Sequence, residues 1–232
     1  MTLRVGAADK ALAERLAVPF DPDAEFVLEY RQGRLQLRDS RDGAPSPLFV
    51  DFASHEIDRR RTAGRQLPVA RAVGIKPDFT PSILDATIGL GRDAYTLHAL
   101  GCAVTGVERS PVIAALLEDG LQRAGADLPL LVGDSCDVMA RLKPDERPQV
   151  VYLDPMFPER RKSAGVKKEM QYMQAILGDD DLLPLFEAAL SCATRRVVVK
   201  RPVNAPYVVE SPKPNHTFAG KTVRFDVYLT TR

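Results

Sequence analysis

The chain has 232 residues, which is enough for one α/β domain of ordinary size together with a small additional unit. Hydrophobic residues make up 45% and charged residues 27%, so the composition excludes a disordered chain and is typical of a globular protein with a core. The formal net charge of +1 excludes a strongly basic protein, and any binding of nucleic acid must therefore come from local basic patches.

Three further features limit the class of protein. No apolar stretch is long enough for a secretory signal or a membrane span. The three cysteines (Cys102, Cys136 and Cys192) are scattered without CxxC spacing, which argues against a disulfide framework and fits a reducing compartment. The three histidines are isolated in the same way, so the sequence predicts no metal site. We therefore expect a cytoplasmic protein that does not bind a membrane.

The first 78 residues (1–78) are expected to form a small α+β appendage. Short apolar segments on either side of Gln32-Gly33 are typical of a β-hairpin. The elements expected here are hairpin strands at 26–30 and 34–37, a third strand at 47–52, a helix at 57–73 that Pro68 interrupts, and a boundary within the proline-containing segment 76–81.

From residue 79 to the end of the chain (79–232), apolar strands alternate with helices, and the turns between them are short. This alternation predicts a Rossmann-like α/β domain, in which a parallel sheet is covered by helices on both faces. The expected strands are 82–87, 103–108, 129–133, 149–154, 196–200 and 222–229. The expected helices are 92–100, 111–123, a short helix after 134–135, and 182–192.

A ligand site is expected beyond the carboxyl ends of these strands, where open α/β sheets bind their ligands. Asp85 lies at the end of the first strand, and a turn with Gly89 and Gly91 follows it. Glycines let the backbone turn sharply and approach a ligand closely. Glu108 ends the next strand, where a carboxylate can accept both hydroxyl hydrogens of a ribose. A purely structural turn is the alternative, but the three features together favour a nucleoside cofactor.

Acidic residues indicate which cofactor this is. No third glycine follows Gly91 at the spacing of a dinucleotide-binding turn, and Asp93 lies where it would repel a pyrophosphate. A carboxylate there suits a cationic sulfonium or amino group instead. Asp134, after the third strand, either receives an adenine amine or caps the following helix. Together these residues favour S-adenosylmethionine (SAM) over NAD.

The fourth strand ends in a motif that suits methyl transfer to an amine of a base. Asp154, Pro155 and Phe157 resemble the acid-Pro-Pro-aromatic motif of methyltransferases that act on exocyclic base amines, with Met156 in place of the second proline. A carboxylate and a fixed backbone carbonyl can accept both amine hydrogens, and the aromatic ring can stack on the base. Such alignment can lower a barrier by about 7–11 kcal/mol. The similar segment 204–207 follows the fifth strand, and we expect it at most to line the pocket.

Two basic segments are candidates for contacts with a phosphate backbone. Residues 59–76 carry six basic side chains and no acidic one, and residues 159–168 follow the transfer motif directly. A run of charges is usually a solvated face, but cations beside a pocket for a base lie where phosphates must pass.

These motifs resemble the ribosomal RNA small-subunit methyltransferase J family. The resemblance covers most of the chain, and residues 1–47 match least. It is carried by the segments 85–94, 108–109, 150–158, 162–170 and 196–202, and also by 49–52, 70–76 and 224–226.

The resemblance implies a Rossmann-like class I methyltransferase sheet with a small N-terminal α+β appendage. It also implies methylation of the 2-amino group of a guanine in small-subunit (16S) ribosomal RNA, with this RNA or the ribosomal particle as the partner. By similarity, the contacts to the cofactor would fall on Arg92, Asp93, Glu108, Arg109, Asp134, Ser135 and Asp154. Asp134 stands where the family often has serine.

Two other functions fit parts of the same pattern. A methyltransferase acting on amines of DNA bases or of other RNAs would need the same acid-Pro-x-aromatic motif. A nucleotide-binding, RNA-associated module without catalysis would keep the glycine turn but has no need of Asp154. The sequence determines neither the modified nucleotide nor the oligomeric state.

Overall fold

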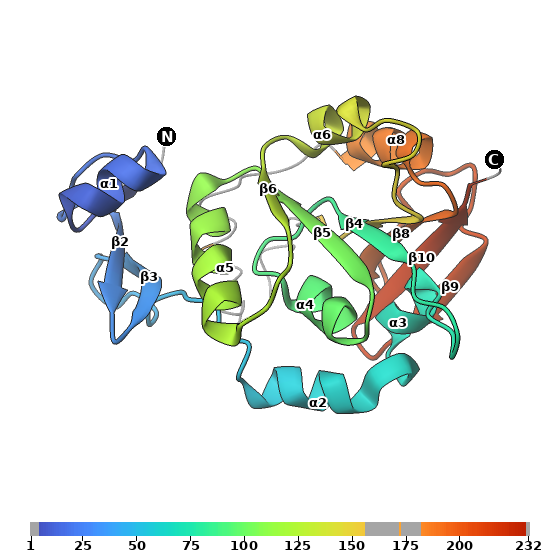
Figure 1. The fold of residues 1–232 in the computed structure, drawn as a ribbon, viewed down its shortest axis with the longest axis horizontal. Helices are drawn as coiled ribbons and strands as arrows, with labels where there is room; N and C mark the ends of the chain where they lie inside the picture. Colours follow the sequence, from blue (N-terminus) through green and yellow to red (C-terminus); the bar gives the residue numbers. More distant parts are fainter. Residues whose placement is uncertain (1–4, 156–171, 173–181, 231–232) are drawn as a thin grey trace. The chain divides into compact units, whose positions relative to one another are not determined.

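The computed structural model describes residues 5–155, 172 and 182–230 (Figure 1). The described residues form two compact units. The N-terminal unit comprises 5–51 and 110–127 together with Tyr172, and the sheet unit comprises 52–109, 128–155 and 182–230.

The N-terminal unit is built on a three-stranded sheet in the order β1-β2-β3. The predicted hairpin is confirmed: β2 and β3 pair antiparallel, and the backbone turns at Gln32 and Gly33 with φ angles of 53° and 74°. The elements of this unit are β1 (Val5–Ala7), α1 (Lys10–Leu16), β2 (Phe26–Arg31), β3 (Arg34–Asp39) and α5 (Pro111–Ala124).

Two details of this unit differ from the prediction. The sequence analysis did not predict β1 or α1, and the strand expected at 47–52 is wrong. Leu48 alone pairs there, exchanging two hydrogen bonds of 2.8 Å with Leu37. The next hydrogen-bonded pair toward the turn would be Asp39 with Ser46, but the Asp39 N–H donates instead to the Tyr172 hydroxyl at 3.2 Å, so the ladder does not continue.

The sheet unit contains a seven-stranded sheet in the order β6-β5-β4-β7-β8-β10-β9. The predicted alternation of strands and helices is confirmed, and the pairings from β6 to β8 are all parallel. Its strands are β4 (Ser82–Asp85), β5 (Ala103–Glu108), β6 (Leu130–Val132), β7 (Val150–Leu153), β8 (Arg196–Pro202), β9 (His216–Ala219) and β10 (Val223–Leu229). Its helices are α2 (His55–Ala63), the 3-10 turn η1 (Gly64–Gln66), α3 (Pro68–Val73), α4 (Arg92–Ala99), α6 (Ser135–Arg141) and α8 (Leu182–Cys192).

The expectation of an entirely parallel sheet needs one correction. β10 pairs antiparallel with both β8 and β9, and the sequence analysis did not predict β9. A tight turn joins β9 to β10, closed by the Gly220 N–H donating to the Val223 carbonyl at 2.7 Å. Strands joined by so short a turn must run antiparallel, because a parallel connection needs a crossover of a dozen residues or more.

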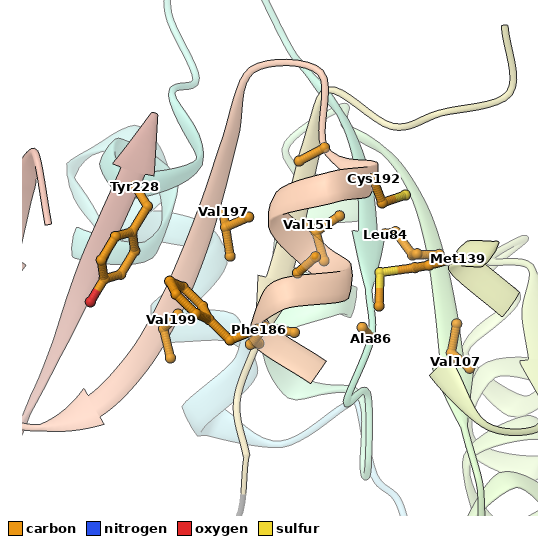
Figure 2. Packing of buried hydrophobic residues seen from close by; sticks show 13 residues of the cluster. Leu84, Ala86, Val107, Met139, Val151, Phe186, Cys192, Val197, Val199 and Tyr228 are labelled. Atoms are coloured by element: carbon orange, nitrogen blue, oxygen red, sulfur yellow. The ribbon is translucent and has the colours of Figure 1, made fainter. Parts of the chain in front are cut away.

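Helices cover both faces of the sheet within this unit, as predicted. α6 and α8 lie on one side, and α2, α3 and α4 lie on the other (Figure 1). A cluster of buried apolar side chains fills the space between the sheet and α8, with Phe186 of α8 packed edge-on against Tyr228 of β10 (Figure 2).

The alternation of side chains along the strands separates this core from a polar face. Val151 and Leu153 of β7, like Val197 and Val199 of β8, belong to the cluster under α8. Successive side chains of a strand point to opposite faces, so Tyr152 and Lys200 lie on the side of α4. The carboxyl ends of the parallel strands therefore carry polar side chains on that face.

Residues 52–78 group with the sheet unit, because α3 packs on β8, β9 and β10 while α2 packs on α4. Pro68 begins α3, where its missing N–H costs nothing, and thus separates two helices as the sequence indicated. The division of the chain into an appendage over 1–78 and a methyltransferase domain over 79–232 stays a prediction. None of the described helices is long and apolar enough to cross a membrane.

Gly106 of β5 is needed because the chain passes closely over it after β4. A Cβ atom at this position would collide with Cδ1 of Ile88, which directly precedes Gly89. The absence of a side chain at Gly106 thus lets Ile88 pack down, at 5% exposure, and brings the glycine turn against β5.

We predict that Gly106→Ala lowers the free energy of unfolding by about 1–3 kcal/mol, the usual cost of overpacking a core. Ile88→Val removes Cδ1, the atom in closest conflict, so the double variant should recover part of the loss. Urea unfolding of the wild type, both single variants and the double variant measures this coupling. If the loss in the double variant equals the sum of the losses in the two single variants, the Cβ conflict does not control the position of the turn.

Candidate functional site

The carboxyl ends of β4 and β5 bring two acidic residues to the same edge of the sheet. Asp85 is the last residue of β4 and Glu108 the last residue of β5, and these strands pair in parallel with Asp85 opposite Gly106. Both side chains are buried. The sequence analysis predicted this juxtaposition, and the structure confirms that the two strand ends are neighbours.

The glycine turn is fastened to Glu108. The Gly89 N–H donates to Oε2 of Glu108 at 3.1 Å, and the Ile88 N–H donates to the Val107 carbonyl at 3.1 Å. Gly89 and Gly91 have φ angles of 52° and 72°, a region that glycine enters without steric cost. The turn that opens α4 is therefore held in place by the acidic residue at the end of the neighbouring strand.

Asp85 is enclosed by protein and lies near other acidic groups. Its Oδ1 accepts the Thr87 N–H at 3.2 Å. Burial raises the pKa of Asp85 well above its ordinary value, and the negative charges of Asp93 and Asp154 act in the same direction. Burial thus favours the protonated form of this carboxyl group at the end of β4.

Asp93, on the first turn of α4, is the centre of a buried ionic cluster. Its Oδ1 pairs with Arg60 of α2, and its Oδ2 accepts both the Tyr152 hydroxyl at 2.7 Å and the Lys200 ammonium at 2.8 Å. Burial opposes ionisation, but the charges of Lys200 and Arg60 outweigh it and lower the pKa of Asp93. Protein cations thus neutralise Asp93, and we expect any contact to a cofactor to be indirect.

Asp154 follows β7 and reaches the same cluster. Its backbone N–H donates to Oγ1 of Thr87 at 2.6 Å, and its Oδ2 accepts from Nζ of Lys200 at 2.7 Å. The side chain of Asp154 is 39% exposed, whereas that of Asp93 is 6% exposed. Burial by the surrounding protein raises the pKa of Asp154, Lys200 opposes this, and Asp93 reinforces it. Asp154 is therefore more exposed than Asp93, Lys200 and Arg60.

The sequence analysis assigned no role to Lys200, although this residue joins the two carboxylates. Burial disfavours its charge, but Asp93 and Asp154 raise the pKa of Lys200 above its ordinary value. The register places Val199 opposite Leu153, so the residues that follow them, Lys200 and Asp154, lie next to each other at the carboxyl ends of the strands. The signal available in the sequence was a lysine directly after the apolar run 197–199, in the strand that follows the strand of the transfer motif.

Asp134 and Ser135 lie where β6 ends and α6 begins. Oδ1 of Asp134 accepts the N–H groups of Cys136 and Asp137 at 2.8 and 3.2 Å, so the helix cap considered in the sequence analysis is present. The hydroxyl of Ser135 donates to the Ala86 carbonyl at 2.6 Å, which ties α6 to the segment after β4. A contact of Asp134 to adenine stays a prediction.

The remaining site residues are placed as follows. Arg92 is the first residue of α4 and is partly buried, and Arg109 follows β5 and is exposed. Pro155 is buried, while Phe157 lies outside the described residues. The basic segment 159–168 lies outside them as well.

The first basic segment, 59–76, is not a uniform solvated patch. Arg60 is committed to Asp93, and its Nε donates to Oγ1 of Thr96 at 3.1 Å. Arg71 lies over the ring of Phe218, 5.0 Å from its centroid. Both residues therefore have roles within the sheet unit.

The loop after β8, which includes Asn204 and Tyr207, is organised by Arg224 of β10. Nη1 of Arg224 donates to the carbonyls of Pro202, Val203 and Ala205 at 3.1, 2.6 and 2.8 Å. The guanidinium lies 4.9 Å from the ring centroid of Tyr207. This loop, whose sequence is similar to the transfer motif, is thus held in place by Arg224.

We predict that Asp93→Asn destabilises the protein by about 3–5 kcal/mol, because it leaves the partly buried Arg60 and Lys200 without their shared carboxylate. The pKa of Asp93 is lower in the folded protein than in the unfolded chain, so the ionised carboxylate stabilises the fold above the unfolded value of roughly 3.9. This stability is lost as the pH falls below that value toward the folded pKa.

Urea unfolding at several pH values tests this prediction. The difference between wild type and Asp93→Asn should be largest above about pH 5 and should shrink below about pH 4. Asp58→Asn, which breaks an exposed pair with Arg61, serves as the matched control and should change little at any pH. A pH-independent difference would contradict the ionic role of Asp93.

The geometry agrees with comparisons to known proteins. A family model described as "Putative SAM-dependent methyltransferase" matches residues 11–230. The crystal structure of a SAM-dependent methyltransferase from Neisseria gonorrhoeae is similar with a TM-score of 0.73 and 32% identity, covering 97% of this chain and 95% of that one.

Curated relatives are more similar in sequence. The ribosomal RNA small subunit methyltransferase J of Pseudomonas aeruginosa (strain UCBPP-PA14) is 48% identical over 95% of this chain and 89% of its own length. The protein of the same name from Dechloromonas aromatica is 48% identical over 96% and 95%. The predicted cofactor is confirmed as S-adenosylmethionine. The chain belongs to the ribosomal RNA small subunit methyltransferase J family of SAM-dependent methyltransferases.

Proposed function

We propose that this chain methylates the exocyclic 2-amino group of a guanine in small-subunit (16S) ribosomal RNA. The names of its relatives support action on small-subunit ribosomal RNA. The observation that carries the choice of an amine is the half-exposed carboxylate of Asp154, followed by the buried Pro155, at the carboxyl end of β7.

The residues at the strand ends fit SAM by their chemistry. Glu108 and Asp134 follow the adjacent strands β5 and β6 and supply carboxylate acceptors for hydroxyl and amine hydrogens. Gly89 and Gly91 present backbone without side chains next to Glu108. We assign the ribose to Glu108, the adenine to the region of Asp134 and Ser135, and supporting roles to Asp85, Arg92 and Arg109. When bound, SAM supplies the methyl group as an electrophile.

Asp154 and Pro155 act on the target amine. An aromatic amine is a weak nucleophile because its lone pair is delocalised into the ring, so its orientation must be controlled. The Asp154 carboxylate accepts one amine hydrogen and the Pro155 carbonyl accepts the other. The amine becomes strongly acidic only as the new bond forms, so Asp154 stabilises developing positive charge instead of removing a proton beforehand.

The partner is the ribosomal RNA, either free or within the ribosomal particle. Phe157 stacks on the target base in this proposal, and the basic segment 159–168 contacts phosphates beside it. Contacts to phosphates position an RNA without reading its sequence, so guanine must be selected within the pocket.

Labelled SAM incubated with separate pools of unmodified small-subunit RNA, reconstituted particles and duplex DNA tests the proposed substrate. Label in a guanine of either RNA pool is the expected result. The pool that takes up more label identifies the partner as free RNA or as the particle. Label in DNA, or in adenine, would overturn the substrate. Binding of SAM without transfer to any pool would favour a non-catalytic RNA-associated module.

Glu108→Gln should weaken binding of SAM by about 1–3 kcal/mol, because the ribose hydroxyls lose a charged acceptor. Isothermal titration calorimetry measures the change in affinity. Glu118→Gln, at an exposed position of α5, is the matched control and should bind normally. Unchanged affinity in a folded Glu108→Gln protein would remove the assignment of the ribose.

Asp154→Ala should lower turnover by about a hundred- to a thousand-fold, the usual loss for one preorganised contact to developing charge. Phe157→Ala should lose stacking worth roughly 1–3 kcal/mol. The dissociation constant of SAM is measured in each variant, so that loss of the cofactor is separated from loss of chemistry. Near-normal methylation by folded Asp154→Ala would refute the proposed role.

A further inference from the structure

Lys200 occupies a position in the ionic cluster that no other described residue shares. Its Nζ lies 2.7 Å from Oδ2 of Asp154 and 2.8 Å from Oδ2 of Asp93. It therefore connects the acid of the transfer motif on β7 with the carboxylate that anchors α4. Within the described part of the chain, Lys200 is the one partner of the Asp154 carboxylate.

The contact is made through one oxygen of Asp154. Oδ2 receives the ammonium group, and no described residue bonds to Oδ1, so Oδ1 is the oxygen that we assign to a hydrogen of the substrate. The backbone of Asp154 is held separately, by the hydrogen bond from its N–H to Oγ1 of Thr87. Backbone and side chain of the acid are thus both fixed before any substrate arrives.

Lys200 is itself held by the cluster. Asp93 receives Lys200, Arg60 and the Tyr152 hydroxyl, so the carboxylate that positions the ammonium group has partners from α2, β7 and β8. The Lys200 side chain is only 23% exposed. A lysine enclosed in this way has lost the rotamer freedom that weakens most lysine ion pairs at a protein surface.

We propose that Lys200 is a positioning residue for methyl transfer, which holds the Asp154 carboxylate by Oδ2 so that Oδ1 is directed at the target amine. This inference rests on the proposed role of Asp154. It assigns to β8 a part in the reaction that the transfer motif on β7 does not contain.

The groups that face Asp154 predict a change in pH dependence when Lys200 is removed. They are Lys200 from β8, Asp93 from α4, Asp85 from β4, Tyr152 from β7 and Arg60 from α2. Without Lys200, Arg60 is the one remaining cation of the cluster for the two carboxylates Asp93 and Asp154. Asp154 then takes up a proton more readily, and a protonated Asp154 holds the amine less well.

The test compares Lys200→Met, which keeps the length of the side chain, with Lys200→Arg, which keeps the charge. Single-turnover methylation of unmodified small-subunit RNA is measured with labelled SAM at saturation over a range of pH. Lys200→Met should slow transfer roughly 100-fold near neutral pH, as expected for a misplaced reacting group. The acidic limb of its rate profile should move upward by about one pH unit or more, with partial recovery at high pH.

Three further measurements complete the design. The dissociation constant of SAM should change little in Lys200→Met, which also shows that the variant is folded. Lys200→Arg should regain much of the rate and the wild-type pH profile. Lys143→Met, at an exposed lysine paired with Glu146, is the matched control and should behave as the wild type.

A double-variant cycle with Asp154→Asn separates this inference from the proposed function. If Lys200 acts through Asp154, adding Lys200→Met to Asp154→Asn should cause no further loss of rate. Two results would overturn the role of Lys200 alone, provided that Asp154→Asn is impaired. One is a Lys200→Met protein with normal rate and pH profile, and the other is fully additive losses in the double variant. A fully active Asp154→Asn would instead overturn the proposed function itself.

Discussion

The arrangement of the candidate site depends on the ionic cluster around Asp93. This carboxylate joins Arg60 of α2, Tyr152 of β7 and Lys200 of β8, and Lys200 extends the connection to Asp154. Four elements from distant parts of the sequence thus meet at one buried charge. Because an unpaired charge costs several kcal/mol in such surroundings, the elements are held to the geometry that keeps every ion paired.

A second constraint, of packing, fixes the turn between β4 and α4. Gly106 leaves room for Ile88, and the Glu108 side chain accepts the N–H of Gly89 from the neighbouring strand. The glycine turn therefore lies on β5 and begins α4 at a defined place. Since α4 carries Asp93, the packing of the turn also fixes the position of the ionic cluster.

Two partly buried cations around the buried Asp93 and the more exposed Asp154 contribute little net stability, because desolvation offsets most of the attraction. Its advantage here is preorganisation: dipoles and charges that are already in place need no rearrangement when charge develops in a reaction. The apolar side of the sheet, between β7, β8 and α8, includes Val151, Leu153, Val197 and Val199 and stabilises the fold by burial of apolar groups. The two faces of the same strands thus divide stability and chemistry between them.

The sequence by itself determined the alternating strands and helices, the glycine turn, the acidic strand ends and the motif at Asp154, because each depends on local chain chemistry or on a period of two along a strand. It did not determine β9, the antiparallel end of the sheet, or the failure of 47–52 to form a strand, which depend on pairing with distant residues. Only the tertiary structure decided that Arg60 forms an ion pair with Asp93 instead of belonging to a solvated basic patch, and that Lys200 forms an ion pair with Asp154. Ion pairs between residues 33, 46 and 107 positions apart leave no periodic signal in a single sequence, since only the folded sheet brings them together.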